Sequence, residues 1–325
     1  MTMGIISKAI NKLIETAVKE IGYLEKKSNK DLDSKTGNAG SANFTKYWRD
    51  VAPALQGSYW CACFISWIFM TAFGLEKAKK LLLHWPYITC QAAYEEFKAV
   101  GRCFTKPKAG DVVVFWNGYR MHHTGLVISV SGTTFTTIEG NTSGGNTVVP
   151  NGGGVAKKTY NIAGSVSAGH RFLRPDYRIA AETKDCSKTV AIWQRFINNE
   201  YKDVLKKYGY KQLATDGDFG QKSKAAALLI WKYIVKQKGN KIIMNEKYGS
   251  NCKAAAKKYI LKTGSNDDLV IIAKGVLAGA GVFSFTGISR NFGPKTLQAV
   301  IDYQELNGLD PDGEIGPKTW EKMLG

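Results

Sequence analysis

The sequence predicts an α+β domain followed by small all-α modules, and three patterns support this prediction. Over roughly the first 100 residues, apolar side chains recur at the i, i+3 and i+4 spacing of helices that bury one face. Between residues 112 and 174, short runs rich in valine, isoleucine, threonine and phenylalanine are separated by turns, as in antiparallel strands. From residue 184 onward, a glycine loop that leads into a helix recurs, which indicates repeated helical units. Helices that precede a set of strands are typical of the α+β class.

The composition indicates a folded chain with more than one domain. The chain has 325 residues, and 44% of them are hydrophobic, which is enough to build cores and excludes a disordered chain. No run approaches the roughly 20 apolar residues of a membrane span, so we expect no membrane insertion. Six cysteines are too few for a disulfide framework in a chain of this length, and the start of the chain shows no signal peptide. We therefore expect synthesis in the cytoplasm with free thiols.

The chain is strongly basic, with a formal net charge of +18 that is spread over both halves. A positive field of this extent favours a polyanionic partner, such as nucleic acid or an anionic cell wall. The sequence contains no nucleic-acid-binding motif and no basic helix with base-reading side chains, so we expect no nucleic-acid partner. A charge that serves only solubility is the remaining alternative.

The chain opens with a helical pattern over residues 5 to 23, with Gly22 as its stop. A polar loop over residues 28–43 follows, in which Asp31 and Asp33 precede a glycine turn, as at the start of a calcium-binding loop. The rest of the calcium-loop pattern is missing, so a solvated loop is favoured over a calcium site.

A buried helix is predicted to begin at Cys61, directly after a loop over residues 53 to 59. Its apolar stripe has helical spacing and consists of Cys61, Phe64, Ile65, Ile68, Phe69 and Ala72, and Gly74 ends the pattern. A cysteine in the first turn of a helix lies beside unpaired N–H groups and the positive end of the helix dipole. Both favour the thiolate, so this position suits a nucleophile. Cys63 points to another side of the helix and is predicted to be a core residue.

The pattern then changes from helices to strands. Residues 76 to 101 continue the helical pattern, with a break at Trp85 and Pro86. Strands are predicted at residues 112–116, 125–130 and 133–138, with a fourth inside 165–174. Residues 141–154 are rich in glycine and asparagine and are predicted to form a long surface loop.

The predicted sheet carries the two groups that a cysteine nucleophile needs, a base and a group that orients the base. His123 lies at the opening of one strand, on the same face as Gly125, whose missing side chain leaves room beside the imidazole. The neighbouring His122 faces the other way. Glu139 ends the next strand, where its carboxylate can hold the imidazole N–H, and Asn141 has the same parity and could share that task.

These residues resemble the CHAP family, the cysteine, histidine-dependent amidohydrolases/peptidases of the papain-like class. The resemblance is carried by Trp60-Cys61-Ala62-x-Phe64-Ile65-Ser66-Trp67, in which x is any residue, by His123-Thr124-Gly125-Leu126-Val127 and by Ile138-Glu139-Gly140-Asn141. It implies a catalytic domain over residues 1–175 in which Cys61 is the nucleophile, His123 the base and Glu139 its orienting group, with Asn141 in support. It also implies an oxyanion hole that includes the backbone N–H of Cys61. Gln56 and Ser58 are both candidates for a further donor, and Trp60 is a third candidate for substrate binding.

A linker, residues 176–183, precedes two helical modules that are predicted at residues 184–262 and 267–325. The loop–helix runs that begin at Asp216 and Glu246 match those that begin at Asn291 and Asp312. The second module resembles the helical peptidoglycan-binding domain through Phe292-Gly293-Pro294-Lys295-Thr296 and Asp312-Gly313-Glu314-Ile315-Gly316-Pro317-Lys318-Thr319-Trp320. The first copy departs from that pattern at Trp231-Lys232-Tyr233, so its binding of wall ligand stays open, and modules that act only as spacers are the alternative.

Together the two resemblances imply an endolysin of a phage or prophage that infects a Gram-positive host. Such an enzyme is made in the host cytoplasm and acts on the cell wall after release. It would cleave an amide of peptidoglycan by cysteine chemistry as a monomer, with no required cofactor. The sugar–peptide amide and a peptide bond of the stem or cross-bridge are both open, as is the target bacterium. The alternatives are a non-catalytic wall-binding or phage tail protein and a cytosolic papain-like protease.

Overall fold

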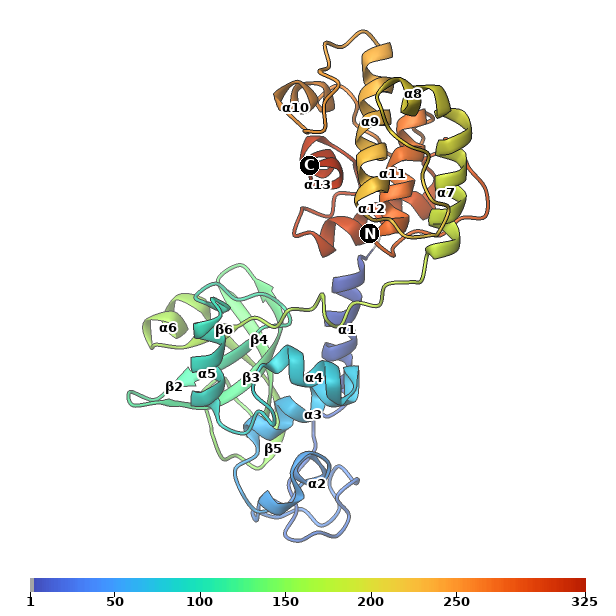
Figure 1. Cartoon of the computed structure of the whole chain (residues 1–325). Helices are drawn as coiled ribbons and strands as arrows, with labels where there is room; N and C mark the ends of the chain where they lie inside the picture. The colour runs from blue at the N-terminus through green and yellow to red at the C-terminus, as the bar shows by residue number, and fades with distance from the viewer. Residues whose placement is uncertain (1–2) are drawn as a thin grey trace. The chain divides into compact units, whose positions relative to one another are not determined.

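The computed structural model describes residues 3–325, and these residues form two compact units (Figure 1). One unit contains residues 8–181. The other contains residues 182–325 together with the described residues before Lys8. The first unit combines helices with an antiparallel sheet and the second is helical, which confirms the predicted fold class. Within residues 3–325, no helix is both long enough and apolar enough to cross a membrane.

Helices precede the sheet in the first unit, as predicted. They are α1 (Ile5–Val18), α2 (Lys46–Val51), the 3-10 helix η1 (Pro53–Leu55), α3 (Cys61–Phe73), α4 (Leu75–Leu82) and α5 (Cys90–Ala99). The predicted start of the buried helix at Cys61 is confirmed, and Gly74 caps its C-terminal end with a φ of 80°. The first helix is shorter than predicted, because it ends at Val18 and turns lead on to Gly22.

The sheet is antiparallel and has the strand order β1-β6-β2-β3-β4-β5. Its strands are β1 (Cys103–Phe104), β2 (Val112–Trp116), β3 (Met121–Ser131), β4 (Thr134–Thr142), β5 (Gly154–Asn161) and β6 (Arg171–Leu173), with α6 (Ile162–Ser167) between the last two. The predictions that correspond to β2, β3, β4 and β6 are confirmed. Helix α3 packs against β3 and β4, and α5 packs against β3. This packing brings the start of α3 to the strands that carry the predicted base and its orienting group.

Strand β5 is the principal element that the sequence pattern does not reveal. Its buried positions include Lys158 as well as Val155, and a lysine there hides the apolar alternation of a strand. Lys158 is buried because its ammonium donates to the hydroxyl of Thr142 at 2.8 Å and to the carbonyl of Thr147 at 2.5 Å. A buried ammonium with such partners is tolerated, whereas an unpaired one would be costly.

The second unit consists of seven helices in its described residues. They are α7 (Ser187–Glu200), α8 (Lys202–Lys207), α9 (Gln221–Gln237), α10 (Ser250–Ala256), α11 (Asp268–Gly279), α12 (Pro294–Leu306) and α13 (Pro317–Leu324). The described residues at the start of the chain belong here because the backbone N–H groups of Ile6 and Ser7 donate to the carboxylate of Glu305, at 2.6 and 3.2 Å.

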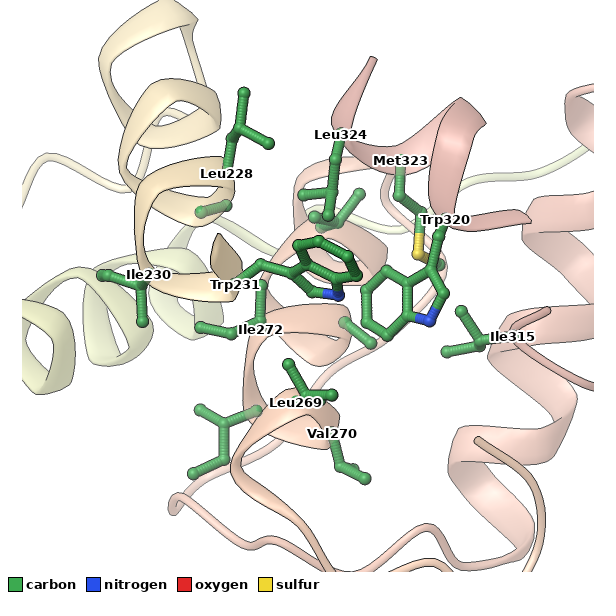
Figure 2. Close-up of a cluster of buried hydrophobic side chains, with 14 of the residues drawn as sticks. Leu228, Ile230, Trp231, Leu269, Val270, Ile272, Ile315, Trp320, Met323 and Leu324 are labelled. Atoms are coloured by element: carbon green, nitrogen blue, oxygen red, sulfur yellow. The ribbon is translucent and has the colours of Figure 1, made fainter. Parts of the chain in front are cut away.

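One hydrophobic core runs through both predicted helical modules, which we call the first repeat (residues 184–262) and the second repeat (residues 267–325). Trp231 of α9 and Trp320 of α13 lie side by side in this core, with ring centroids 5.8 Å apart (Figure 2). Leu269, Val270 and Ile272 of α11 belong to the same cluster. Because large aromatic side chains from both repeats share one core, neither repeat buries its apolar face alone.

Each repeat has two glycine loops, and each loop is held by one buried polar side chain from a long helix that precedes it. In two of the four loops this side chain is a glutamine. Gln304 of the second repeat accepts from the N–H of Gly313 at 2.9 Å, and its amide group donates to Asp312 and to the carbonyl of Glu314. Gln194 binds the loop at Gly217 in the same way in the first repeat.

Lysines hold the other two loops. The ammonium of Lys232 donates to the carbonyls of Asn245 and Lys247, and that of Lys274 donates to the carbonyls of Ser289 and Asn291. In the sequence, Lys232 departs from the pattern of the peptidoglycan-binding domain. In the structure it holds a loop, as Gln304 does in the second repeat.

Candidate active site

Cys61 is the first residue of α3, and its side chain is buried. The N–H of Ala62 is one of the groups that lower the pKa of the Cys61 thiol, after Cys90 and His123, as expected where the first N–H groups of a helix have no helical partner. Trp60 precedes Cys61 and fixes the start of the helix. Its fully buried indole donates a hydrogen bond to Glu25 at 2.8 Å and packs on Tyr47, with 5.3 Å between ring centroids. Trp60 is therefore a core residue that positions Cys61, with its side chain shielded from solvent.

His123 and Glu139 meet inside the sheet. Nε2 of His123 lies 3.0 Å from Oε2 of Glu139, and both side chains are completely buried. The contact depends on Gly125, because a Cβ at this position would lie 2.5 Å from Cγ of Glu139. The hydroxyl of Thr137 donates to the other carboxylate oxygen at 2.6 Å, and Phe115 stacks on the imidazole at 5.6 Å. The carboxylate thus fixes both the orientation and the tautomer of the imidazole.

The second imidazole nitrogen is not bonded to the carboxylate. Since Nε2 is bonded to Glu139, Nδ1 is the nitrogen left for the Cys61 sulfur, which interacts with this ring. Nδ1 has no partner within ordinary hydrogen-bonding limits among residues 3–325. A long contact of this kind is common in enzymes without bound substrate and shortens when the substrate is in place.

The electrostatics of the site favour an ion pair. Burial lowers the pKa of His123, but the sulfur of Cys61 and the carboxylate of Glu139 outweigh it and raise that pKa to about 9. On the other side, the thiol of Cys90 lowers the pKa of Cys61 most, burial opposes this, and His123 lowers it further, to well below the ordinary value of a thiol. Both shifts favour the thiolate and the imidazolium over the neutral pair.

The neighbours Cys63 and His122 have different environments. Cys63 is fully buried, and burial raises the pKa of its thiol well above the ordinary value. Nδ1 of His122 lies 2.9 Å from the carbonyl of Phe115, and burial lowers the pKa of its imidazole. Of the two adjacent histidines, the structure brings His123 to the thiol and the carboxylate.

Cys90 is the residue of this site that the sequence analysis missed. It is the first residue of α5, is buried, and its thiol interacts with that of Cys61, where it is the strongest influence that lowers the pKa. Tyr87, three residues before Cys90, forms two hydrogen bonds that hold this segment. The hydroxyl of Ser66 donates to the Tyr87 carbonyl, and the Tyr87 hydroxyl donates to the Thr124 hydroxyl, each at 2.9 Å. These bonds join Cys90 to α3 and β3, the elements that carry Cys61 and His123. The available signal was a further cysteine, Cys90, shortly after the predicted helix break at Trp85 and Pro86.

Replacing Cys90 with alanine should make the Cys61 thiol less acidic. The Cys90 thiol is the strongest influence that lowers the pKa of Cys61, so its removal raises that pKa and shifts the acid limb of the activity profile to higher pH. The measurement is the pH dependence of iodoacetamide alkylation at Cys61, followed by peptide mass spectrometry. Cys90→Ser retains a donor and should lie closer to the parent, whereas an unchanged profile in Cys90→Ala would contradict the role assigned to this thiol.

Asn141 lies near the site but hydrogen-bonds elsewhere. It is buried in a left-handed conformation with a φ of 54°, its amide group donates to Asn43 at 3.3 Å, and its carbonyl oxygen accepts from the N–H of Gly153 at 3.3 Å. The structure therefore brings Glu139, and not Asn141, to the imidazole. The side chain of Asn141 ties the end of β4 to the loops around it.

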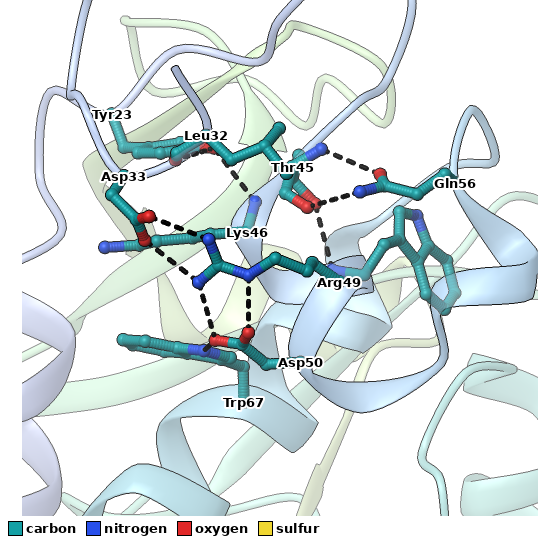
Figure 3. Close-up of polar contacts among 10 residues, drawn as sticks. Tyr23, Leu32, Asp33, Thr45, Lys46, Arg49, Asp50, Gln56 and Trp67 are labelled. Carbon is teal, nitrogen blue, oxygen red and sulfur yellow. Dashed lines mark hydrogen bonds and ion pairs between the residues drawn. The ribbon is translucent and has the colours of Figure 1, made fainter. Parts of the chain in front are cut away.

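The two residues predicted as further oxyanion donors have hydrogen-bond partners in α2 and at the residue that precedes it. The side-chain amide of Gln56 bonds both the N–H and the carbonyl of Thr45, each at 2.9 Å (Figure 3). Ser58 is exposed, and its carbonyl accepts from the indole of Trp48 at 2.9 Å. In this arrangement Gln56 and Ser58 shape the loop before Cys61, and the backbone N–H groups at the start of α3 are the donors at hand.

The carboxylate of Asp33, in the acidic loop over residues 28–43, forms an ion pair with Arg49. Both carboxylate oxygens of Asp33 are bonded to the guanidinium of Arg49, at 2.7 and 2.9 Å (Figure 3). Asp31 is exposed. Residues 3–325 contain no group of three or more His, Cys, Asp and Glu side chains that could hold a metal ion. Calcium prefers several oxygen ligands around one point, and in this structure the oxygens of Asp33 are bonded to Arg49.

A thiol at a helix start, an imidazole beside it and a carboxylate on the next strand form the constellation of papain-like cysteine hydrolases. In agreement with this class, the CHAP domain model matches residues 54–141, which contain Cys61, His123 and Glu139. The peptidoglycan binding domain model matches residues 266–323, most of the second repeat. The chain therefore carries a CHAP domain in its N-terminal half and a peptidoglycan-binding domain at its C-terminal end.

Comparison with individual proteins adds little. An uncharacterized protein in the bpoA1 3' region of Kitasatospora aureofaciens is 59% identical to this chain over 32 residues. This match covers 10% of the chain and 27% of the relative, whose name assigns it no activity. No solved structure matches the chain.

Proposed function

We propose that this protein is an endolysin that hydrolyses an amide bond of bacterial peptidoglycan by cysteine catalysis. The observation that carries the proposal is the buried Cys61–His123–Glu139 arrangement within a CHAP domain, in a chain that also has a peptidoglycan-binding domain. The geometry supplies each role in acyl transfer: a nucleophile, a proton carrier and a group that orients the carrier.

The reaction follows from these roles. The Cys61 thiolate attacks the amide carbon, and the N–H groups at the start of α3 stabilise the resulting oxyanion, a contribution of about 3 kcal/mol for one such donor. The His123 imidazolium gives its proton to the leaving amine, which breaks the C–N bond and leaves a thioester on Cys61. Neutral His123 then takes a proton from water, the hydroxide attacks the thioester, and the carboxylic product leaves as the thiolate re-forms.

The biological setting is part of the proposal. The enzyme is made in the cytoplasm of a Gram-positive host during phage or prophage development and reaches the wall after release. The net charge of +18 supports a partner that is a polyanion, such as the wall of these bacteria. The second candidate, a wall-binding or tail protein without activity, is disfavoured by the polarised thiol–imidazole pair, which a purely binding protein does not need.

Purified cell walls test the proposal directly. The full chain should clear a wall suspension, and mass spectrometry of the released fragments should show one class of new amine ends. New amino groups on the stem peptide's first residue would identify the sugar–peptide amide, whereas ends within the peptide would identify an endopeptidase. Turbidity that stays constant with walls from several Gram-positive species would contradict the proposal and favour the binding protein.

Separating the two units should divide activity from binding. Residues 1–181 should hydrolyse a small soluble peptidoglycan fragment at a rate close to that of the full chain but clear intact walls more slowly, because a tethered catalytic domain works at higher local concentration. Residues 182–325 should sediment with walls and release nothing, and high salt should weaken this sedimentation in part. If residues 182–325 stay in the supernatant at every salt concentration, they act as a spacer.

A further inference from the structure

The second unit contains a cavity between its two repeats, with a volume of about 620 Å³. Phe219 and Lys224 of the first repeat line it, together with Val276, Tyr303, Lys322 and Met323 of the second repeat. This volume lies within the range of about 300–1,000 Å³ that is usual for small-ligand sites. We propose that this cavity is a single composite site for a carboxylate-bearing wall peptide, built by both repeats. The proposal rests on the proposed function and names the part of the wall that the second unit binds.

The two repeats are in close contact at this cavity. A Cβ at Gly279, at the end of α11, would lie 2.4 Å from Cγ of Phe219, so the absence of a side chain lets the first repeat's phenylalanine lie directly against the second repeat. Phe219 also packs on Trp193, with 5.2 Å between ring centroids. Since the peptidoglycan binding domain match begins at residue 266, Phe219 and Lys224 are additions to the matched domain. The first repeat is therefore one wall of the site rather than a spacer.

The chemistry of the lining favours a peptide with a free carboxylate. Val276, Tyr303 and Met323 are buried apolar or aromatic side chains that suit the methyl groups of an alanine-rich peptide. At the rim, Lys224 and Lys322 are exposed and have no ion-pair partner among residues 3–325. Two carboxylates also line the cavity: that of Glu321 is paired with Lys253 at 2.6 Å, and Gly325 carries the terminal one. The two ammonium groups of Lys224 and Lys322 outnumber the one carboxylate without a lysine partner, so the lining keeps a positive charge. Stem peptides of peptidoglycan combine alanine methyl groups with carboxylates.

Charge reversal at the rim tests the site without disturbing the core. The protein is the full chain with Cys61→Ala, so that it binds walls without digesting them. Lys224→Glu and Lys322→Glu are each expected to weaken the binding of a soluble stem peptide at least tenfold in calorimetry. Lys222→Glu and Lys318→Glu make the same charge change at exposed lysines outside the cavity lining and should alter binding less than twofold. Circular dichroism checks that all four variants are folded.

The outcomes distinguish this inference from the proposed function. If the cavity variants bind the stem peptide like the controls, the cavity is not the site, although sedimentation of the parent with walls would still support the proposed function. If only Lys322→Glu weakens binding, the site belongs to the second repeat alone and the composite site is wrong. If the variants lose binding to untreated walls but not to walls stripped of anionic polymers, the ligand is the polymer and the peptide assignment is overturned. If the parent binds neither walls nor peptide, the proposed function fails as well.

Discussion

Replacing Cys61 with alanine should abolish hydrolysis of cell walls while leaving the fold and wall binding intact. Cys61 is the only thiol of the described residues that interacts with a histidine imidazole, and the reaction has no other nucleophile of this kind. Loss of the nucleophile in a hydrolase of this mechanism typically lowers kcat by at least about 10⁴-fold. The side chain is small, so the cavity that alanine leaves should cost about 1 kcal/mol of unfolding free energy. Turbidity of purified walls and thermal unfolding of the variant measure the two effects.

Cys63→Ala is the matched control for this experiment. It removes the same atom two residues along α3, from a fully buried thiol whose pKa is raised. This variant should keep most of the activity of the parent, with a similar small loss of stability. Equal activity in Cys61→Ala and the parent would show that Cys61 is not the nucleophile. An inactive Cys63→Ala with an intact fold would show that Cys63 is the nucleophile instead.

Local sequence patterns were sufficient to locate the central parts of the site. Helical spacing predicted that Cys61 begins a buried helix, and the alternation of strand residues separated His123 from His122. The same alternation predicted that Gly125 leaves room beside the imidazole. Each of these inferences depends on residues only a few positions apart, and the backbone geometry of helices and strands fixes such relations.

Contacts between distant segments could not be predicted in this way. The interaction between Cys90 and Cys61 joins two helices, and the segment before Cys90 is held by the bonds of Tyr87 to Ser66 and Thr124. Likewise, Gln56 has the polarity of an oxyanion donor, but its partner is the backbone of Thr45. A polar side chain satisfies its hydrogen bonds with whichever groups the fold brings close, and composition does not identify these groups.

The helical unit shows the same division. The glycine loops and the helix starts after them repeat in the sequence, so two related copies were evident. The pairing of Trp231 with Trp320 in one core was not evident, because each tryptophan would suit the core of its own copy equally well. The packing of α9 against α13 determines that the two tryptophans share one core. Residues of both helices also line the cavity between the repeats.

Replacing His123 with alanine should abolish activity, whereas His122→Ala should retain most of it. Of this pair, it is His123 that bonds Glu139 and interacts with Cys61. His122 instead bonds the carbonyl of Phe115. Without the imidazolium, the leaving amine receives no proton and the pKa of Cys61 rises, so a loss of about 10⁴-fold in kcat is expected. Single-turnover assays on a soluble peptidoglycan fragment measure this loss. A dead His122→Ala beside an active His123→Ala would reverse the roles.

Glu139→Gln should reduce activity less than His123→Ala and should also change its pH dependence. The carboxylate raises the pKa of His123, which lies at about 9, so its replacement by a neutral amide lowers that pKa. The imidazolium is then lost at lower pH, and the alkaline limb of the kcat/KM profile moves from near pH 9 toward neutrality. Thr137→Val is the matched control, since it removes the hydroxyl that donates to Glu139 but keeps the charge, and it should leave the alkaline limb nearly in place. An alkaline limb that does not move in Glu139→Gln would show that this limb reports a group other than His123.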